Sequence, residues 1–438
     1  MADTSRTRVA LAALPVALVA AACGTTTGTD SDSGSDGGAQ GTITVLMEEI
    51  SYTDNIRDML PQFEEATGIA VNIETVPYAD QASRILQEFA QGSTTYDVVF
   101  NDNVYGPGYF ESQYVSDLNE FADDEEFASF DEFFEPYLAP MTTDDGAIFG
   151  LPVYGESTFL MYRTDVFEEY GIDGPPETTD DLMDAARTIT EGSDGEIAGI
   201  TMRATSGIHA VYPWAGILRS FGGDFYQGTD LAIDSAESVE ATQFWVDMLS
   251  NYAPAGVANF DWEQNRIAFT QGQAAMTIDA TANGPFNEDE SSSVVAGNVG
   301  YAPIPYAAGV TPGENTNNSL AVHALFMNSA SENQEAAWKF MTWATSEEVQ
   351  ANAVETVEAV GVTNAAVLDG DAYAQRYGAF QEAVMGQLET GNIAYLPSGT
   401  DANTIIVETG QALSNALAGT DVQEALTTAA ESIEAQVG

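Results

Sequence analysis

Three residues beside the ends of predicted strands have side chains suited to neighbouring hydroxyl groups: Glu156, Arg203 and Asp279. An ionised carboxylate only accepts hydrogen bonds and can take two at once, and an arginine fork donates several in one plane. Together these groups would hold the adjacent hydroxyls of a carbon chain. Each residue also has a plain structural interpretation: Arg203 as the partner of one of many acids, Asp279 as a turn former and Glu156 as a surface acid.

A second set of polar side chains follows two strands predicted early in the chain. Ligands of open α/β sheets gather at the carboxyl ends of the strands, so these loops are candidates for binding. The residues are Glu48 and Glu49 after the first strand, and Asn101, Asp102, Asn103 and Tyr105 after the third. The Asn-Asp-Asn run is also ordinary turn chemistry. Trp214 is a further candidate, as a stacking wall, although a single Trp is more often a core residue.

Strands and helices alternate in the segments that would position these residues. Buried strands are predicted at 42–47 and 96–100, with helical periodicity between them that Gly68 ends. Further strands are predicted within 148–163, 274–279 and 299–304, and the chain is mainly helical from Asn333 onward. Such alternation predicts an α/β fold with parallel βαβ units and helices on both faces of a sheet.

The charge of the chain is strongly one-sided. It has 68 acidic and 11 basic residues, a formal net charge of -57, and Lys339 is its single lysine. Nucleic acid and anionic membrane surfaces are therefore excluded as partners. Because the carboxylates are scattered along the whole chain, they indicate a solvated, salt-adapted surface, and we expect stability to fall at low ionic strength.

The first 40 residues have the features of an export signal and a tether. Arg6 and Arg8 precede an apolar run that ends at Ala22, which predicts a signal peptide over 1–22. Cys23, the only cysteine, follows in a sequence that resembles a bacterial lipobox, and we expect it to be acylated. Residues 23–40 are nearly all Gly, Ser, Thr and Asp, which predicts a flexible tether.

The sequence lacks the residue patterns that metal binding, phosphate binding and nucleophilic catalysis need. The only histidines, His209 and His323, have no metal-ligand spacing, and a single cysteine builds no thiol-based metal site. No Gly-rich phosphate loop, nucleophile elbow or His-centred triad is present. We therefore expect no cofactor, no metal and no enzymatic activity.

Four segments in order resemble the family of extracellular solute-binding proteins that includes the maltose-binding protein. They lie at 151–167 (LPVYGESTFLMYRTDVF), 217–225 (ILRSFGGDF), 267–281 (IAFTQGQAAMTIDAT) and 336–349 (AAWKFMTWATSEEV). The resemblance covers the chain from Thr42 onward and implies a two-lobed periplasmic-binding-protein fold with a hinge and a ligand cleft between the lobes. It implies one lobe of 41–154 plus 306–333 and a second of 155–305 plus 334–438. It also implies a lipid-anchored, monomeric subunit of an ABC importer on the extracellular face of the membrane, with membrane permease subunits as partners.

Within that family the chain is most similar to members that bind sorbitol, mannitol and other polyols. This resemblance rests on Tyr154-Gly155-Glu156-Ser157, on the strand end at Arg203 and on 278–281 (IDAT). Maltose-type members continue there into an aromatic residue that stacks on a sugar ring, whereas this chain has Ala282. A small polyhydroxylated carbohydrate, a linear polyol or a sugar, is the implied ligand. Tyr154 and Asn318 are further candidate ligand-binding residues, although Asn317 and Asn318 depart from the pattern, because those relatives have tryptophan there.

Rival functions remain open from sequence. A glycosidase needs only two carboxylates beside a bond, although the order of elements is not that of eight βα units. A disaccharide or a polyamine could also occupy the same fold. Glu48, Glu49, Glu156 and Asp279 would suit a polyamine, whereas Arg203 in the same cleft would repel one.

Overall fold

The computed structural model describes residues 41–122, 129–311, 316–357 and 361–437. The signal peptide, Cys23 and the tether expected over 1–40 lie outside these residues. The strands are β1 (Thr42–Glu48), β2 (Ala70–Val76), β3 (Val98–Asp102), β4 (Leu151–Glu156), β5 (Thr158–Arg163), β6 (Tyr226–Gln227), β7 (Asp230–Leu231), β8 (Met276–Ala280), β9 (Val299–Ala302) and β10 (Ala321–Met327). The helices are α1 (Ser51–Thr67), α2 (Tyr78–Ala90), α3 (Gly106–Glu111), α4 (Glu135–Leu138), α5 (Thr164–Glu169), α6 (Thr179–Gly192), α7 (Ile208–Ser220), α8 (Ala236–Tyr252), α9 (Trp262–Thr270), α10 (Gly284–Glu288), α11 (Gln334–Ala344), α12 (Glu347–Thr356), α13 (Ala365–Leu368), α14 (Asp371–Glu389), α15 (Ala402–Leu417) and α16 (Val422–Val437).

The larger sheet has the strand order β2-β1-β3-β10-β4. β1 pairs in parallel with β2 and β3, as predicted, and β10 pairs antiparallel with both β3 and β4. β4 therefore runs in the same direction as β1 and β3. The last residues of these three strands, Glu48, Asp102 and Glu156, lie at the same edge of the sheet, where ligands of such sheets bind.

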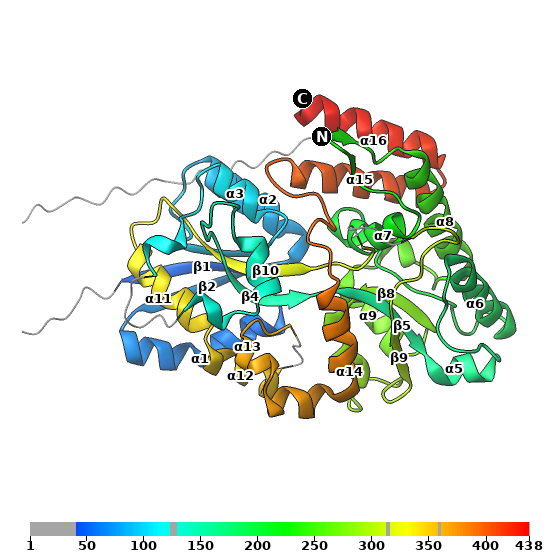
Figure 1. Cartoon of the computed structure of the whole chain (residues 1–438), viewed down its shortest axis with the longest axis horizontal. Helices are drawn as coiled ribbons and strands as arrows, with labels where there is room; N and C mark the ends of the chain where they lie inside the picture. The colour runs from blue at the N-terminus through cyan, green and yellow to red at the C-terminus, as the bar shows by residue number, and fades with distance from the viewer. Residues whose placement is uncertain (1–40, 123–128, 312–315, 358–360, 438) are drawn as a thin grey trace, which may run out of the picture. The chain divides into compact units, whose positions relative to one another are not determined.

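The central strands of this sheet are covered on both faces. β3 and β10 are buried along their whole length, as expected for strands under helices on both sides. In Figure 1, α2 and α3 lie on one side of the sheet, and α1, α11 and α12 on the other. The helix stop predicted at Gly68 is confirmed: its φ is 70° and its N–H donates to the carbonyl of Glu64, an arrangement that favours glycine.

The smaller sheet has the order β8-β5-β9, with antiparallel pairs. The chain passes from the larger sheet to the smaller one at Ser157, between β4 and β5. Hydrogen bonds hold this crossing: Ser157 N–H donates to Thr281 Oγ1 over 3.1 Å, and Ser319 N–H donates to Thr158 Oγ1 over 3.0 Å. Around the smaller sheet, α7 packs against α8 and α15, and α15 against α16.

Two packing arrangements differ from the lobe assignment that the resemblance implies. The helices after 334 were expected with the second lobe, but α11 packs on β10 and β4, and α11 and α12 both pack on α1 of the first. Conversely, the segment from 306 was expected with the first lobe. Tyr306 forms a bridge with Thr178, and Asn317 donates to the carbonyl of Ile304, both in the second. The apolar periodicity of a helix predicts which of its faces is buried, but it does not indicate which sheet packs against that face.

Candidate ligand-binding site

Arg203 and Asp279 are brought together by the register of their backbones. Thr201 forms a parallel bridge with Thr277, so the residues two places further along lie side by side. Arg203 Nε donates to Asp279 Oδ1 over 2.8 Å, and its Nη2 donates to the same oxygen. Asp279 Oδ2 accepts from Asn265 over 2.6 Å. Because both carboxylate oxygens are occupied within this lobe, Asp279 orients Arg203.

Glu156 is the carboxylate at the end of β4. It is 6% exposed and accepts a hydrogen bond from the hydroxyl of Tyr154. Burial raises the pKa of Glu156, against the opposing effects of the Arg203 charge and of hydrogen bonds from Tyr154 and Tyr212. Tyr212, on α7, also lies under the Arg203 guanidinium, whose carbon is 5.0 Å from the ring centroid.

Two further carboxylates come from the larger sheet. Burial and the neighbouring charges of Glu156 and Asp102 raise the pKa of Glu48 to about 8. Burial raises the pKa of Asp102 to about 6, although Asp102 accepts a hydrogen bond from the hydroxyl of Tyr78 over 2.9 Å. Since Arg203 also acts on Glu48, charged groups attached to both sheets influence one another here.

Glu48, Asp102, Glu156, Arg203 and Asp279 form a cluster of charged groups, and both histidines of the chain lie in it. His323, on β10, is paired in register with Asp102 on one side and Tyr154 on the other. Its Nδ1 is 3.8 Å from Glu48 Oε2. His209, at the start of α7, packs with its ring centroid 5.8 Å from that of Tyr78. Burial, with the Arg203 charge, lowers the pKa of each imidazole to about 4, so both are neutral at pH 7.

Several buried polar atoms in this cluster have no hydrogen-bond partner among the described residues. They are Tyr52 Oη, His209 Nδ1 and His323 Nδ1. The ring of Tyr52 packs on Tyr154, with centroids 5.4 Å apart. A buried polar group without a partner costs about 1–3 kcal/mol, so a ligand that supplies hydroxyls would be stabilised by these groups.

The sequence-predicted residues fall into two groups. Glu48, Tyr154, Glu156, Arg203 and Asp279 are brought together in the cluster, and the charge of Asp102, another member, acts on the buried Tyr105. The other predicted residues make different contacts. Glu49 is exposed, Asn101 donates to Tyr109, Asn103 accepts from Val322, Asn318 donates to the carbonyl of Gln387, and Trp214 is fully buried with its Nε1 donating to Thr242.

Sequence reasoning did not select Tyr52, Tyr78, His209, Tyr212 or His323 for this site. A signal existed for two of them: His209 and Tyr212 are three residues apart on one helix that follows Arg203 closely. No local signal marked His323, because it lies inside the continuous apolar run of β10.

No group of three or more His, Cys, Asp or Glu could hold a metal ion in the described part of the chain. None of its helices is long and apolar enough to cross a membrane.

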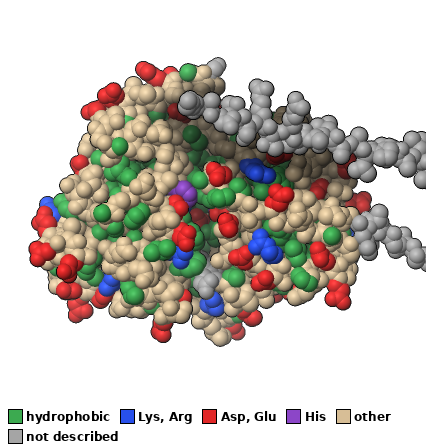
Figure 2. Space-filling view, turned by 180° about the vertical axis from the view of Figure 1, so that it is seen from behind, with side chains coloured by type: hydrophobic (Ala, Val, Ile, Leu, Met, Phe, Trp, Pro, Cys, Tyr) green, Lys and Arg blue, Asp and Glu red, His purple; other side chains and the backbone are tan. Residues whose placement is uncertain are grey.

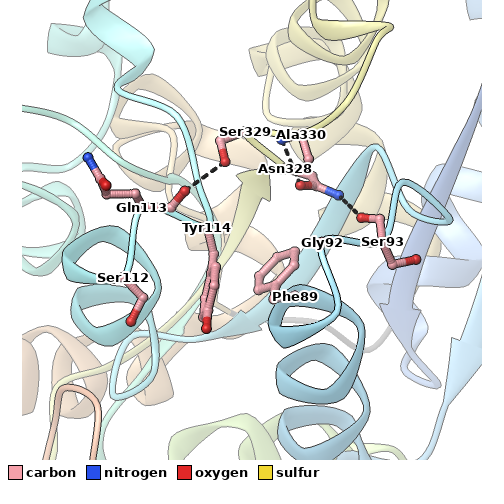
Figure 3. Close-up of a pocket in the computed structure, with 9 residues that line it drawn as sticks. All are labelled: Phe89, Gly92, Ser93, Ser112, Gln113, Tyr114, Asn328, Ser329 and Ala330. Atoms are coloured by element: carbon pink, nitrogen blue, oxygen red, sulfur yellow. Dashed lines mark hydrogen bonds between the residues drawn. The ribbon is translucent and has the colours of Figure 1, made fainter.

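A surface pocket of about 350 Å³ lies at the other end of β10, beyond Met327, between the ends of α2 and α3 (Figure 3). Because the carboxylates lie at the opposite end of this strand, the pocket is separate from the cluster.

The fold and this cluster define a two-lobed binding protein. Residues 49–351 match the family model of the bacterial extracellular solute-binding proteins, and the chain belongs to this family. Its members are transport proteins that bind solutes, and membership gives the chain an extracellular or periplasmic location.

Relatives of this chain include proteins with named ligands. The erythritol/L-threitol-binding protein of Mycolicibacterium smegmatis is 28% identical over 332 residues, which are 72% of this chain and 68% of the relative. An ABC transporter solute-binding protein of Agrobacterium vitis with bound D-mannitol has a TM-score of 0.82 at 25% identity, covering 91% of this chain and 98% of that one. A protein from Agrobacterium radiobacter in complex with ribitol has a TM-score of 0.82 at 23% identity, covering 90% and 98%.

Proposed function

We propose that this chain is the substrate-binding lipoprotein of an ABC importer and that it captures a small linear polyol. The carrying observation is that Glu48, Asp102 and Glu156 end three strands at one edge of the larger sheet, and that the charge of Arg203 acts on Glu48 and Glu156. Hydroxyls on adjacent carbons can donate to the carboxylates and accept from the guanidinium. The named ligands of relatives, erythritol/L-threitol, D-mannitol and ribitol, are all linear polyols and support this class.

Binding would proceed by closure of the two lobes about the crossing at Ser157, as in periplasmic binding proteins. The contact between Tyr78 and His209 supports this, since it joins a helix over the larger sheet to one beside the smaller sheet. Closure buries the hydroxyls of the ligand, so each needs a partner, and each missing partner costs about 1–3 kcal/mol. The site would therefore select for hydroxyl configuration.

The proposal also includes the membrane anchor and the absence of catalysis. Cys23 would carry the lipid, two acyl chains would make attachment stable, and residues 23–40 would tether a monomeric binding unit near the permease subunits. We propose that the site binds without turnover. Activity on polymeric or aryl glycosides that disappears in Glu156→Gln would overturn this part.

Adaptation to salt is a further part of the proposal. Acidic side chains are scattered over the uncovered part of the face drawn in Figure 2, with a few basic ones among them. A dense negative surface repels itself, and dissolved salt screens this repulsion.

A thermal-shift panel in high salt tests the ligand class. Alditols of four to six carbons, monosaccharides, disaccharides and polyamines are each added to the purified chain. A ligand at a hundred times its dissociation constant adds about 2.7 kcal/mol to the free energy of unfolding. We expect this from an alditol. A shift with disaccharides alone would reject the polyol and keep the binding function, and a shift with polyamines alone would reject both carbohydrate classes.

A matched pair of variants localises the site. Glu156→Gln keeps the shape of the side chain but removes a charged acceptor, whose hydrogen bonds contribute about 1.5–3 kcal/mol. We expect it to weaken binding of D-mannitol by at least tenfold in calorimetry. Glu49→Gln changes an exposed acid one residue beyond β1 and serves as the control. Equal affinities of the two variants would remove Glu156 from the site.

A further inference from the structure

The charges of the cluster do not balance. The guanidinium of Arg203 is matched by Asp279 through two hydrogen bonds to Oδ1. Among the ion pairs of the described residues, none joins an arginine or lysine to Glu48, Asp102 or Glu156. Arg203 acts on Glu48 and Glu156 without an ion pair to either, so none of the three carboxylates is directly paired with an arginine or lysine among the described residues.

A buried ring nitrogen of His323 has no hydrogen-bond partner and lies near Glu48, one of these three carboxylates. His323 is 5% exposed, its Nδ1 has no hydrogen-bond partner, and this atom lies 3.8 Å from Glu48 Oε2. Burial, aided by the nearby Arg203 charge, lowers the pKa of this imidazole to about 4, so it is neutral at pH 7. A neutral imidazole has a lone pair on one of its two ring nitrogens, so His323 can accept a hydrogen bond beside Glu48 and its register partner Asp102.

A primary ammonium group matches these three acceptors. It has three donor hydrogens and no acceptor, and like the lysine side chain it is charged at pH 7. Burial, with the charges of Glu156 and Asp102, raises the pKa of Glu48 to about 8, and burial raises the pKa of Asp102 to about 6. A bound ammonium group would lower both pKa values and so favour the ionised carboxylates that accept its hydrogen bonds. A ligand carboxylate at the same place would instead oppose ionisation of these groups, and it would lose its hydration without gaining a counter-charge.

We infer that the site also takes hydroxylated amines, whose ammonium group replaces a terminal hydroxyl and contacts Glu48, Asp102 and His323, and that it rejects the corresponding acids. This inference rests on the proposed function, because it names the charge class of ligands for the same site.

Three ligands that differ at one carbon test the inference: D-mannitol, 1-amino-1-deoxy-D-mannitol and D-mannonate. Calorimetry at pH 7 is expected to give the amine at least tenfold higher affinity than D-mannitol, and the acid at least a hundredfold lower affinity. Glu48→Gln should reduce the ratio of amine to mannitol affinities by at least tenfold. Glu49→Gln, at the exposed neighbouring acid, should leave that ratio within threefold of the unaltered chain.

The outcomes separate this inference from the proposed function. Binding of D-mannonate within threefold of D-mannitol, or a ratio that Glu48→Gln does not change, overturns the charge preference while the polyol function stands. Binding of the amine without D-mannitol supports the charge preference and overturns the neutral polyol as ligand. Binding of none of the three overturns both.

Discussion

Arg203 and Asp279 are 76 residues apart in the sequence and form a buried ion pair in which Nε donates to Oδ1 over 2.8 Å. Their side chains are 6% and 0% exposed. Asn265 holds the second oxygen of Asp279, and Thr201 in turn donates to Asn265 over 2.8 Å. The pair is thus part of a polar network that presents one face of the guanidinium to Tyr212.

Breaking this pair should destabilise the free protein. Arg203→Ala leaves Asp279 buried without its counter-charge, which costs about 3–5 kcal/mol. Urea unfolding in high salt measures the change in the free energy of unfolding. The double variant Arg203→Met/Asp279→Leu, which removes both charges, should recover most of that stability but not the binding of D-mannitol. If the single and double variants unfold at the same urea concentration, the charge left unpaired is not the cause.

The raised pKa of Glu48 predicts how stability depends on pH. Between its ordinary pKa of 4.5 and about 8, the native chain holds a proton that the unfolded chain has released. This contribution is therefore complete below pH 4.5 and is lost as pH rises to 8. The two histidines, with pKa lowered to about 4 from 6.5, act in the opposite direction, but only below pH 6.5.

Between pH 6.5 and 8 the histidines no longer oppose the effect of Glu48, and the raised pKa of Glu156 acts in the same direction as that of Glu48. There the free energy of unfolding should fall through Glu48 by up to about 1.4 kcal/mol per pH unit, and Glu48→Gln should remove this part of the slope. Melting curves of the ligand-free chain at constant salt measure it, with Glu49→Gln as the control. Parallel pH profiles for the unaltered chain and Glu48→Gln would contradict a protonated Glu48.

Gly155 allows β4 to bring Tyr154 and Glu156 into the site. A Cβ at this position would lie 2.2 Å from Cε1 of Tyr137, a buried ring. Gly155→Ala should therefore cost about 1–3 kcal/mol of stability and weaken D-mannitol binding, because the strand end must shift. Thermal unfolding and calorimetry measure the two effects.

Gly386 provides the matched control for that substitution. It lies within α14, and a Cβ there would meet nothing within 4 Å. Gly386→Ala should stabilise the chain by about 0.5–1 kcal/mol through helix propensity, without an effect on binding. Equal responses of the two variants would show that crowding against Tyr137 is not limiting.

Added salt should stabilise the chain to the extent that it screens the repulsion between the acidic side chains. With 68 acidic and 11 basic residues, self-repulsion is largest at low ionic strength. We expect the melting temperature to rise steeply up to about 1 M KCl, where the screening length has fallen to about 3 Å, and then to level off. Sucrose, which is uncharged, serves as the control. A melting temperature that does not depend on KCl concentration would refute salt adaptation.

Much of the site was predictable because local patterns mark strand ends. The apolar run before Glu48 and the run before Asn101 both predicted strands whose carboxyl ends bind ligands, and the structure has β1 and β3 there. The pattern did not separate neighbours within a loop, however. Asp102 faces Tyr78, whereas Asn101 and Asn103 bond to Tyr109 and Val322, because successive side chains of a strand point to opposite faces.

The sequence by itself determined that the chain alternates strands with helices, that its surface is acidic and that Glu156, Arg203 and Asp279 stand beside strand ends. Only the tertiary structure decided that Arg203 and Asp279 bond to each other and that β10 inserts between β3 and β4, carrying His323 to Glu48. Periodicity records which side chains are buried, which is a local property. Strand pairing joins segments hundreds of residues apart, and no local pattern specifies the partner.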